Sequence, residues 1–435
     1  MPSALKSLSK RIAATVLALL SCLAAGSEYP SNQFLTGDWD GRRDAVRDRG
    51  IDLKLNYTTE SMYLASGGED DDDGTYTHNI GLDLLLDMER LVGFGDTTLL
   101  VKFSHREGDS VSAENVAPSE GGNTFTVQEI YGGQTHKLAN VQLNTALMDE
   151  RLDLAYGRLV ANDDFLRSPL YCQFVNNSFC GSPKAVFLQD PFTFSAYPTA
   201  QWGARARYDT PSRNWTLMGA IYDGDPELKG GDPDDNGDNK HGTSLEFGDN
   251  GAVFALETHY HHNRFSSDKL PGVYKVGGYY MSGDFRDISR TDSRTTDGNA
   301  MVWLTADQML IRETAGSSQG LSWFGTLVFS LEDQVNSMDE YFGTGLVYQG
   351  LFPNRPNDTT GLAITAGWYS DELNKARKLE GKAEQDYEAV IELNHKFILG
   401  HGIEFQPDIQ YIIDPAGTGD IDDAFLIGAK VVVQF

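Results

Sequence analysis

The residues best suited to bind a small solute gather in one segment of the chain, residues 161–197. Its charged and amide side chains can donate or accept hydrogen bonds: Asp163, Asp164, Arg167, Asn176 and Asn177. Its aromatic side chains offer flat apolar faces: Tyr171, Phe174 and Phe179. No pairing of a nucleophile with a base stands out, and neither a P-loop nor an H-E-x-x-H motif occurs. The segment therefore predicts noncovalent recognition of a polar solute, and we expect no enzymatic activity.

The same segment holds the two cysteines that follow residue 26, Cys172 and Cys180. In an oxidising compartment an isolated close pair of this kind forms one local disulfide. We expect the bond to staple the segment, which is a structural role rather than a chemical one.

One stretch further along the chain carries a weak signal for calcium. Asp232, Asp234, Asn236 and Asp238 follow the spacing with which an EF-hand loop begins, but Thr243 stands where the loop needs a glutamate. A solvated acidic loop is the simpler interpretation, and weak calcium binding is the alternative. We expect no obligatory cofactor and no firm metal site.

The composition predicts an exported and strongly acidic protein. Lys6, Lys10 and Arg11 precede an apolar run, so residues 1–26 resemble a secretory signal peptide. Without them the chain keeps 32 basic residues (35 minus 3) and 63 acidic ones, a net charge of −31. Such a surface disfavours nucleic acid, and an anionic ligand would need a local basic site. No run of about 18 apolar residues follows, so we expect no transmembrane helix.

Polar and apolar residues alternate from residue 51 to Phe435, and this period predicts sixteen β-strands. The connections between these strands alternate between short and long, which is typical of outer-membrane barrels. We place the fourth strand at Thr124–Lys137, which leaves an unusually long connection at Leu138–Glu150. The predicted fold is an all-β, 16-stranded antiparallel outer-membrane β-barrel over residues 51–435.

The segment that precedes the barrel, residues 27–50, has a different pattern. Aspartates and arginines alternate in it around a thin apolar face. We expect a short periplasmic helix, with Asp38 as its N-cap and Gly50 at its end.

The alternation also separates lipid-facing from lumen-facing side chains. Ile391 opposes Glu388 and Glu392 on the fourteenth predicted strand. Because an Arg or Lys at the bilayer midplane costs roughly 2–4 kcal/mol, the charged set must face water inside the barrel. The same rule adds three lumen residues to the candidate binding set: Arg205, Arg207 and Glu129. A barrel of sixteen strands is wide enough for an aqueous channel.

Two runs of the sequence resemble a known family, the carbohydrate-selective porins of the OprB type. They are FLTGDWDGRRDAVRDRGIDLKLNYTTE, from Phe34 to Glu60, and GRLVANDDFLRSPLYCQFVNNSFCGSPKAVF, from Gly157 to Phe187. The resemblance implies a sixteen-stranded barrel that passes glucose and related sugars by diffusion. It also implies that residues 161–197 form a loop that enters the pore. Acidic groups on that loop, facing Arg205 and Arg207 across the pore, would favour neutral polar solutes over ions of either sign.

Two other functions stay open. A general or anion-selective porin would need a net basic constriction, and four acidic residues predicted to face the lumen argue against one: Glu388, Glu392, Glu404 and Asp408. The second alternative is a structural barrel whose acidic loops bind ions or surface partners. We expect mono- and oligosaccharides as solutes, and lipid and lipopolysaccharide of the bacterial outer membrane as surroundings. The sequence leaves both a monomer and a homotrimer possible.

Overall fold

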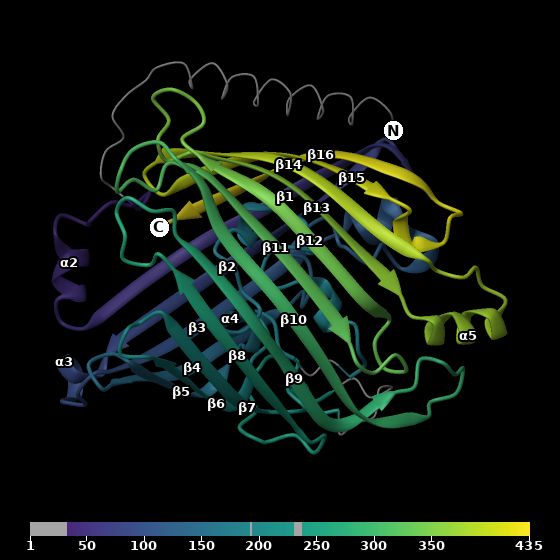
Figure 1. Cartoon of the computed structure of the whole chain (residues 1–435), viewed down its shortest axis with the longest axis horizontal. Coiled ribbons are helices and arrows are strands. Elements are labelled where there is room, and N and C mark those ends of the chain that lie inside the picture. Colours follow the sequence, from purple (N-terminus) through teal and green to yellow (C-terminus); the bar gives the residue numbers. More distant parts are fainter. Residues whose placement is uncertain (1–32, 192–193, 230–236) are drawn as a thin grey trace.

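A computed structural model describes residues 33–191, 194–229 and 237–435. Sixteen antiparallel strands form one closed barrel, in which each strand pairs with the next and β1 pairs with β16 (Figure 1). The strands are β1 (Ile51–Gly68), β2 (Asp73–Asp87), β3 (Thr97–Gly108), β4 (His136–Leu147), β5 (Leu152–Leu159), β6 (Gln201–Asp209), β7 (Trp215–Asp223), β8 (Ala252–His262), β9 (Gly272–Arg286), β10 (Thr295–Arg312), β11 (Gly320–Ser330), β12 (Met338–Gln349), β13 (Thr359–Tyr369), β14 (Tyr387–Gly400), β15 (Ile403–Ile413) and β16 (Asp422–Gln434). The prediction of an all-β, sixteen-stranded antiparallel barrel is confirmed.

Short helices lie between the strands and at the two ends of the barrel. They are α2 (Arg42–Arg47), α3 (Met88–Val92), α4 (Ala161–Asp164), α5 (Asp371–Glu380), the π-helix η1 (Ser112–Val116), and the 3₁₀ turns η2 (Pro118–Glu120), η3 (Tyr171–Gln173), η4 (Lys184–Phe187) and η5 (Pro415–Gly417). Figure 1 shows α2 and α3 at one end of the barrel and α5 at the other. Within the described ranges, no helix combines the length and the apolar character needed to cross a bilayer.

The N-cap predicted before the barrel is wrong. The first described helix, α2, begins at Arg42, and its N-cap is Gly41, which has a φ of 80°. Asp38 instead accepts a hydrogen bond at its backbone carbonyl, from the Arg43 amide at 3.1 Å. The left-handed conformation at Gly41 is one that glycine adopts without a steric penalty. The N-cap therefore lies three residues after Asp38, and the helix begins four residues after it.

The strands bury one face inside the barrel and expose the other, as the alternation predicts. On β14 the side chains of Glu388 and Glu392 are fully buried, whereas Ile391 and Leu393 are 36% and 45% exposed. Exposed apolar side chains on the outer face and polar ones on the inner face are what a lipid-embedded barrel requires.

The fourth strand is not where the sequence predicts it. β4 spans His136–Leu147 and pairs with β3 and β5 on either side. The supposed strand Thr124–Lys137 lies mostly in a loop inside the barrel, and the supposed long connection Leu138–Glu150 is mostly β4 itself. The alternation at residues 124–131 has another cause: Phe125 and Val127 are fully buried in the lumen. Their amides bond to side chains, Glu388 and Ser112, instead of to a neighbouring strand.

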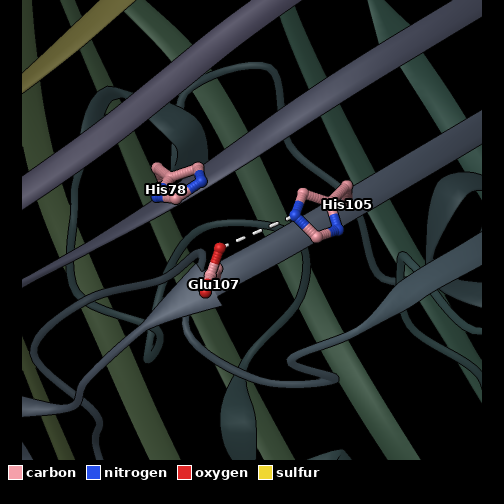
Figure 2. A group of neighbouring side chains, drawn as sticks. All are labelled: His78, His105 and Glu107. Atoms are coloured by element: carbon pink, nitrogen blue, oxygen red, sulfur yellow. Dashed lines mark ion pairs between the residues drawn. The ribbon is translucent and has the colours of Figure 1, made fainter.

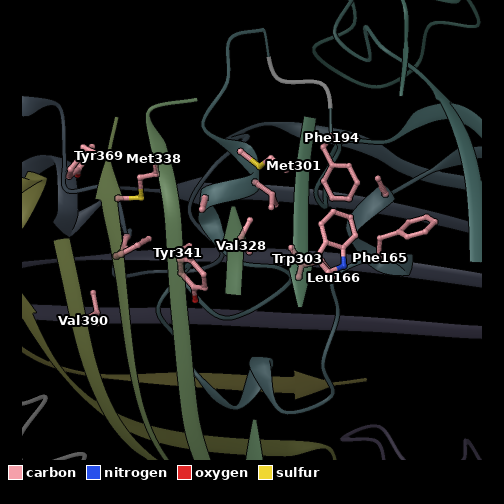
Figure 3. Packing of buried hydrophobic residues seen from close by; sticks show 14 of the residues in the cluster. Phe165, Leu166, Phe194, Met301, Trp303, Val328, Met338, Tyr341, Tyr369 and Val390 are labelled. Atoms are coloured by element: carbon pink, nitrogen blue, oxygen red, sulfur yellow. The ribbon is translucent and has the colours of Figure 1, made fainter. Parts of the chain in front are cut away.

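Two long loops fold into the barrel and fill part of it. We name them L2 (residues 109–135, between β3 and β4) and L3 (residues 160–200 without 192–193, between β5 and β6). Phe165, Leu166 and Phe194 of L3 pack beside Trp303 and Met301 of the wall (Figure 3). The ring centroids of Phe194 and Trp303 are 6.5 Å apart. The largest buried core of the protein is thus the contact between these loops and the inner wall.

Buried carboxylates of the wall hold the loop backbones in place. The two oxygens of Glu388 accept hydrogen bonds from the amides of Phe125 at 2.6 Å and Thr124 at 3.0 Å in L2. The two oxygens of Glu392 accept from the amides of Val175 at 2.7 Å and Asn176 at 3.0 Å in L3.

A third wall carboxylate repeats the pattern. One oxygen of Glu257, on β8, accepts from the L3 amide of Leu166 at 2.9 Å and from the indole N–H of Trp303 at 2.6 Å. Hydrogen bonds to ionised acceptors are among the strongest in proteins. They also satisfy backbone donors that would otherwise be buried without a partner.

These anchors predict the result of replacing Glu392 with Ala. Glu392→Ala leaves the buried amides of Val175 and Asn176 without acceptors, at about 1–3 kcal/mol for each amide. We expect a lower free energy of unfolding in urea titrations in detergent, together with faster proteolysis of L3. Glu404→Ala is the matched control, because Glu404 lies on the neighbouring strand and its side chain makes no hydrogen bond or ion pair with any described residue. Equal stability of the two variants would contradict the anchoring role.

Candidate functional site

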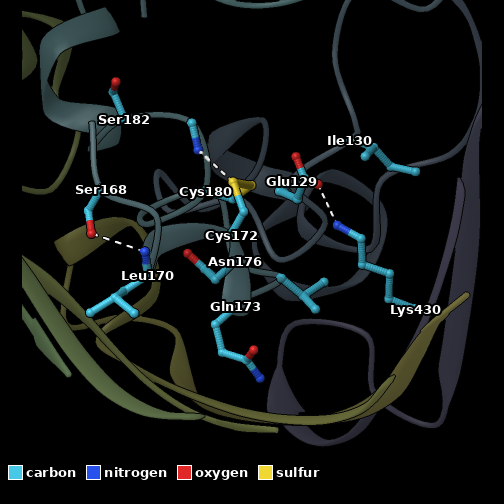
Figure 4. Close-up of a disulfide and its surroundings, with 12 residues drawn as sticks. Glu129, Ile130, Ser168, Leu170, Cys172, Gln173, Asn176, Cys180, Ser182 and Lys430 are labelled. Carbon is cyan, nitrogen blue, oxygen red and sulfur yellow. Dashed lines mark hydrogen bonds and ion pairs between the residues drawn. A yellow bond between two sulfur atoms is a disulfide. The ribbon is translucent and has the colours of Figure 1, made fainter. Parts of the chain in front are cut away.

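Cys172 and Cys180 form a disulfide in the middle of L3 (Figure 4). The bond joins the two ends of the segment 172–180, which packs against β11–β14. Beside the disulfide, Glu129 of L2 forms an ion pair with Lys430 of β16, at 2.5 Å between Oε1 and Nζ. L2 and L3 therefore meet the wall around the disulfide.

A cavity of about 490 Å³ lies next to this bond, between L2, L3, the wall and the loop that follows β7. Six residues of the candidate set line it: Glu129, Asp163, Arg167, Cys172, Asn177 and Cys180. Seven do not: Asp164, Tyr171, Phe174, Asn176, Phe179, Arg205 and Arg207.

The aromatic side chains predicted to contact a solute are packed into the wall instead. Tyr171, Phe174 and Phe179 are at most 2% exposed and surround Phe324 of β11, with ring centroids 5.4–6.1 Å away. The Tyr171 hydroxyl is hydrogen-bonded to that of Thr326. Burial raises the pKa of the Tyr171 hydroxyl well above its usual value, which keeps this hydroxyl protonated. The prediction that these rings line the pore is wrong, because their apolar area is used to fix L3.

Asn176 is also part of the scaffold. Its side-chain amide donates to the carbonyl of Phe125 in L2 at 3.0 Å and to the Gln410 side chain on β15 at 2.9 Å. With its backbone amide on Glu392, this fully buried residue ties L2, L3 and the wall together. It has no polar atom left to offer a solute in the cavity.

Arg205 and Asp164 contact each other directly rather than facing one another across an opening. The Arg205 Nε lies 3.1 Å from Asp164 Oδ1, and Arg205 also pairs with Asp153. Burial raises the pKa of the Asp164 carboxyl, and the charge of Arg205 counteracts this shift. Arg207 is exposed two residues further along β6. The predicted opposition of loop acids and wall arginines across the pore is therefore wrong.

Sequence reasoning missed most of the basic residues that line the cavity. Three of its four cationic residues were not in the candidate set: Arg106, Lys137 and Lys184. Arg106 was missed because the third strand was predicted to end at His105, whereas β3 continues to Gly108. Lys137 was predicted to be the last residue of a strand, whereas it is the second residue of β4. Lys184 lies in a run that carries the family resemblance. It forms no hydrogen bond or ion pair within the described part of the chain, and burial lowers the pKa of its amine.

Three of the four acidic residues expected to line the pore are covered, and the fourth, Glu404, is partly exposed. Glu388, Glu392 and Asp408 are at most 2% exposed, because L2 and L3 lie over them. They cannot offset positive charge at the cavity surface as the sequence suggested.

A separate group of possible metal ligands lies outside the lumen. The ligand atoms of His78, His105 and Glu107 all lie within 4.8 Å of one another on β2 and β3 (Figure 2). Since the flanking Asn79 and Arg106 are buried inside, these three side chains point outward. The predicted calcium residues Asp232, Asp234 and Asn236 lie outside the described residues, and the fourth, Asp238, is exposed; calcium binding there stays a prediction.

A closed sixteen-stranded barrel whose lumen is narrowed by inward loops to a polar cavity defines the class of porins. The model of the carbohydrate-selective porin OprB family matches residues 71–435, and the chain belongs to that family. It is 28% identical to Porin B of Pseudomonas aeruginosa, over 95% of this chain and 93% of that protein. It is 26% identical to the putative porin QuiX of Acinetobacter baylyi, over 98% of each. Its fold matches the high pH structure of Pseudomonas putida OprB with a TM-score of 0.84 at 25% identity, over 94% of this chain and 100% of that one.

The family resemblance stated from the two sequence motifs is therefore confirmed. The protein is a sugar porin of the bacterial outer membrane, and the members of its family are channels.

The ion pair between Asp164 of L3 and Arg205 of β6 predicts the effect of removing Arg205. Arg205→Ala leaves the Asp164 carboxylate buried without its partner, which costs about 3 kcal/mol when a buried pair is broken. Because the unpaired carboxyl binds its proton more tightly in the folded state, this loss grows as pH rises above about 4, the usual aspartate value, and shrinks below it. Urea unfolding at pH 4 and pH 7 measures the difference.

Two further variants control this experiment. Arg207→Ala removes a nearby exposed arginine and should leave stability nearly unchanged at both pH values. Adding Asp164→Asn to Arg205→Ala should restore part of the loss at pH 7, because no buried charge then remains at position 164. A pH-independent loss would show that the missing side-chain volume, rather than the charge, is responsible.

Proposed function

We propose that the cavity beside the disulfide is the constriction through which glucose-sized sugars diffuse passively. Its volume of about 490 Å³ falls within the range of small-molecule sites. The observation that carries the proposal is the contrast between the two sets of loop residues. The side chains of the first set, such as Tyr171 and Asn176, are buried in contacts that fix L2 and L3. The side chains of Asp163, Arg167 and Asn177 lie on the cavity surface.

The cavity offers the two kinds of contact that a sugar needs. Amide and charged side chains replace the water lost by hydroxyl groups, and Tyr131, Tyr197 and Phe187 provide flat apolar faces for C–H groups. A channel must bind its solute weakly enough to release it. A rigid frame with few free polar groups suits that requirement, and the mechanism needs no cofactor.

The remaining expectations are part of the same proposal. The solutes are mono- and oligosaccharides. The barrel is a monomer or a homotrimer, and lipid and lipopolysaccharide surround it.

The chain has no catalytic activity. The pentapeptide Gly316–Gly320 matches G-x-S-x-G by letters, but it belongs to the turn between β10 and β11 and to the start of β11. It does not form the strand-to-helix elbow that such a nucleophile requires.

Replacing Asn177 with Ala tests the position of the constriction. Asn177→Ala removes one hydrogen-bonding group, worth about 1 kcal/mol, so roughly fivefold more glucose should be needed to half-block the ion current. The measurement is current through the purified porin in a planar bilayer, titrated with glucose. Thr58→Ala is the control, because Thr58 faces the lumen from β1 but does not line the cavity. If both variants respond to glucose as the unmodified porin does, the constriction lies elsewhere.

A further inference from the structure

The cavity carries a charge opposite to that of the chain as a whole. The full chain has a net charge of −28. Among the described residues, the cavity is lined by four basic side chains and three acidic ones: Arg106, Lys137, Arg167, Lys184, Glu129, Asp163 and Glu227. The lining therefore has a net charge of +1 (4 minus 3).

The acidic side chains of the cavity are already paired with lysines that do not line it. Glu129 lies 2.5 Å from the amine of Lys430. Asp163 lies 3.7 Å from the amine of Lys102, and Glu227 lies 3.8 Å from that of Lys229. Each of these three carboxylates thus has a lysine behind the cavity surface, and Lys430 is shared with the buried Glu60, 3.0 Å away.

Among the residues that the structure describes, the basic side chains of the cavity form no ion pair. Arg167 donates to the carbonyl of Asp163 at 2.8 Å, and Lys137 donates to the hydroxyl of Thr199 at 2.8 Å. Arg106 donates to the carbonyl of Gly132 at 3.2 Å. Neutral oxygens satisfy donors without cancelling their charge, so the positive charge stays available to an anion.

Arg106 shows the imbalance most clearly. It is only 7% exposed, and its Nε has no hydrogen-bond partner in the described structure. Its guanidinium group lies 5.3 Å from the ring centroid of Tyr197, which also lines the cavity. The charges of Glu129 and Glu60 attract this guanidinium, but neither carboxylate forms an ion pair with it. A planar guanidinium is the group that best matches a carboxylate.

We propose that this porin prefers monosaccharides that carry one carboxylate, the aldonic and uronic acids, over neutral hexoses. The inference rests on the proposed function, because it assigns a substrate class to the same cavity. A net charge of +1 complements a monoanion, whereas the three lining carboxylates oppose a dianion such as a sugar phosphate. The hydroxyl groups of the solute contact the neutral polar side chains, such as Asn162 and Asn177.

Glucose and glucuronate provide the matched pair of probes, because they share a ring and differ only at carbon 6. The purified full-length porin is reconstituted in liposomes, and uptake of each sugar is measured with potassium salts and valinomycin present to prevent a diffusion potential. We expect glucuronate to enter at least about threefold faster than glucose, the effect of one modest ion pair. Glucose 6-phosphate and chloride are measured in the same way.

Lys184→Gln is the decisive variant, since Lys184 makes no hydrogen bond or ion pair within the described structure and its loss should not disturb the fold. It should lower the glucuronate-to-glucose ratio towards one. Lys54→Gln is the control, because Lys54 lies on β1 outside the cavity lining and pairs with Asp52 at 3.7 Å. It should leave the ratio unchanged.

The outcomes separate this inference from the proposed function. Entry of glucose with a ratio of one or less overturns the preference for sugar acids and leaves the sugar channel intact. Failure of both sugars to enter overturns the proposed constriction as well. Chloride and glucose 6-phosphate could also enter faster than glucose by the same factor as glucuronate, and all three could lose this advantage in Lys184→Gln. That result would show a general anion filter and would also overturn the inference.

Discussion

The hydrogen bonds from loop amides to buried carboxylates of the wall are the constraint on which the rest of this structure depends. A barrel of sixteen strands satisfies its own backbone but encloses more space than its inward side chains can fill. L2 and L3 narrow that space, and their backbones bring donors with no strand to pair with. Glu388, Glu392 and Glu257 accept from those donors at 2.6–3.0 Å, so the wall supplies the partners that a neighbouring strand would have provided. These contacts help to hold the parts of L2 and L3 that line the cavity.

The same contacts set the charge of the pore surface. Each wall carboxylate that anchors a loop is covered by that loop and is lost to the cavity, whereas cations of β3, β4 and L3 line the cavity. A strongly acidic chain can therefore line an internal cavity with a net positive charge. Because the surrounding protein has a lower dielectric constant than water, a small net charge in a narrow opening acts on a solute more strongly than the same charge on the outer surface.

The sequence predicted the barrel because one rule, alternation with period two, applies to almost every strand. Ile391 and Glu392 show why: a lipid-facing and a lumen-facing residue must differ in polarity whatever else they do. The rule failed at residues 124–137, where Phe125 and Val127 alternate with polar residues because they enter a core inside the lumen. The candidate site was predicted less well, since residue type alone cannot tell an aromatic ring that packs a loop from one that meets a solute. Phe174 packs and Tyr197 lines the cavity, and the difference depends on contacts with strands more than a hundred residues away in the sequence.

A passive channel has to reconcile a fixed shape with weak binding, and the division of labour within L3 meets both needs. Asn176 and Asn177 are adjacent and chemically identical. The Asn176 side chain donates hydrogen bonds to L2 and β15, whereas the Asn177 side chain lines the cavity. The rigid neighbour holds the free one in place, so a solute meets groups that are already oriented and loses little affinity to their ordering. Because few groups are left free, and because water can replace the solute at each of them, the bound state stays shallow enough for release. If a buried side chain such as Asn176 faced the cavity instead, the solute would bind more tightly. The loop that holds this side chain would then be less firmly fixed.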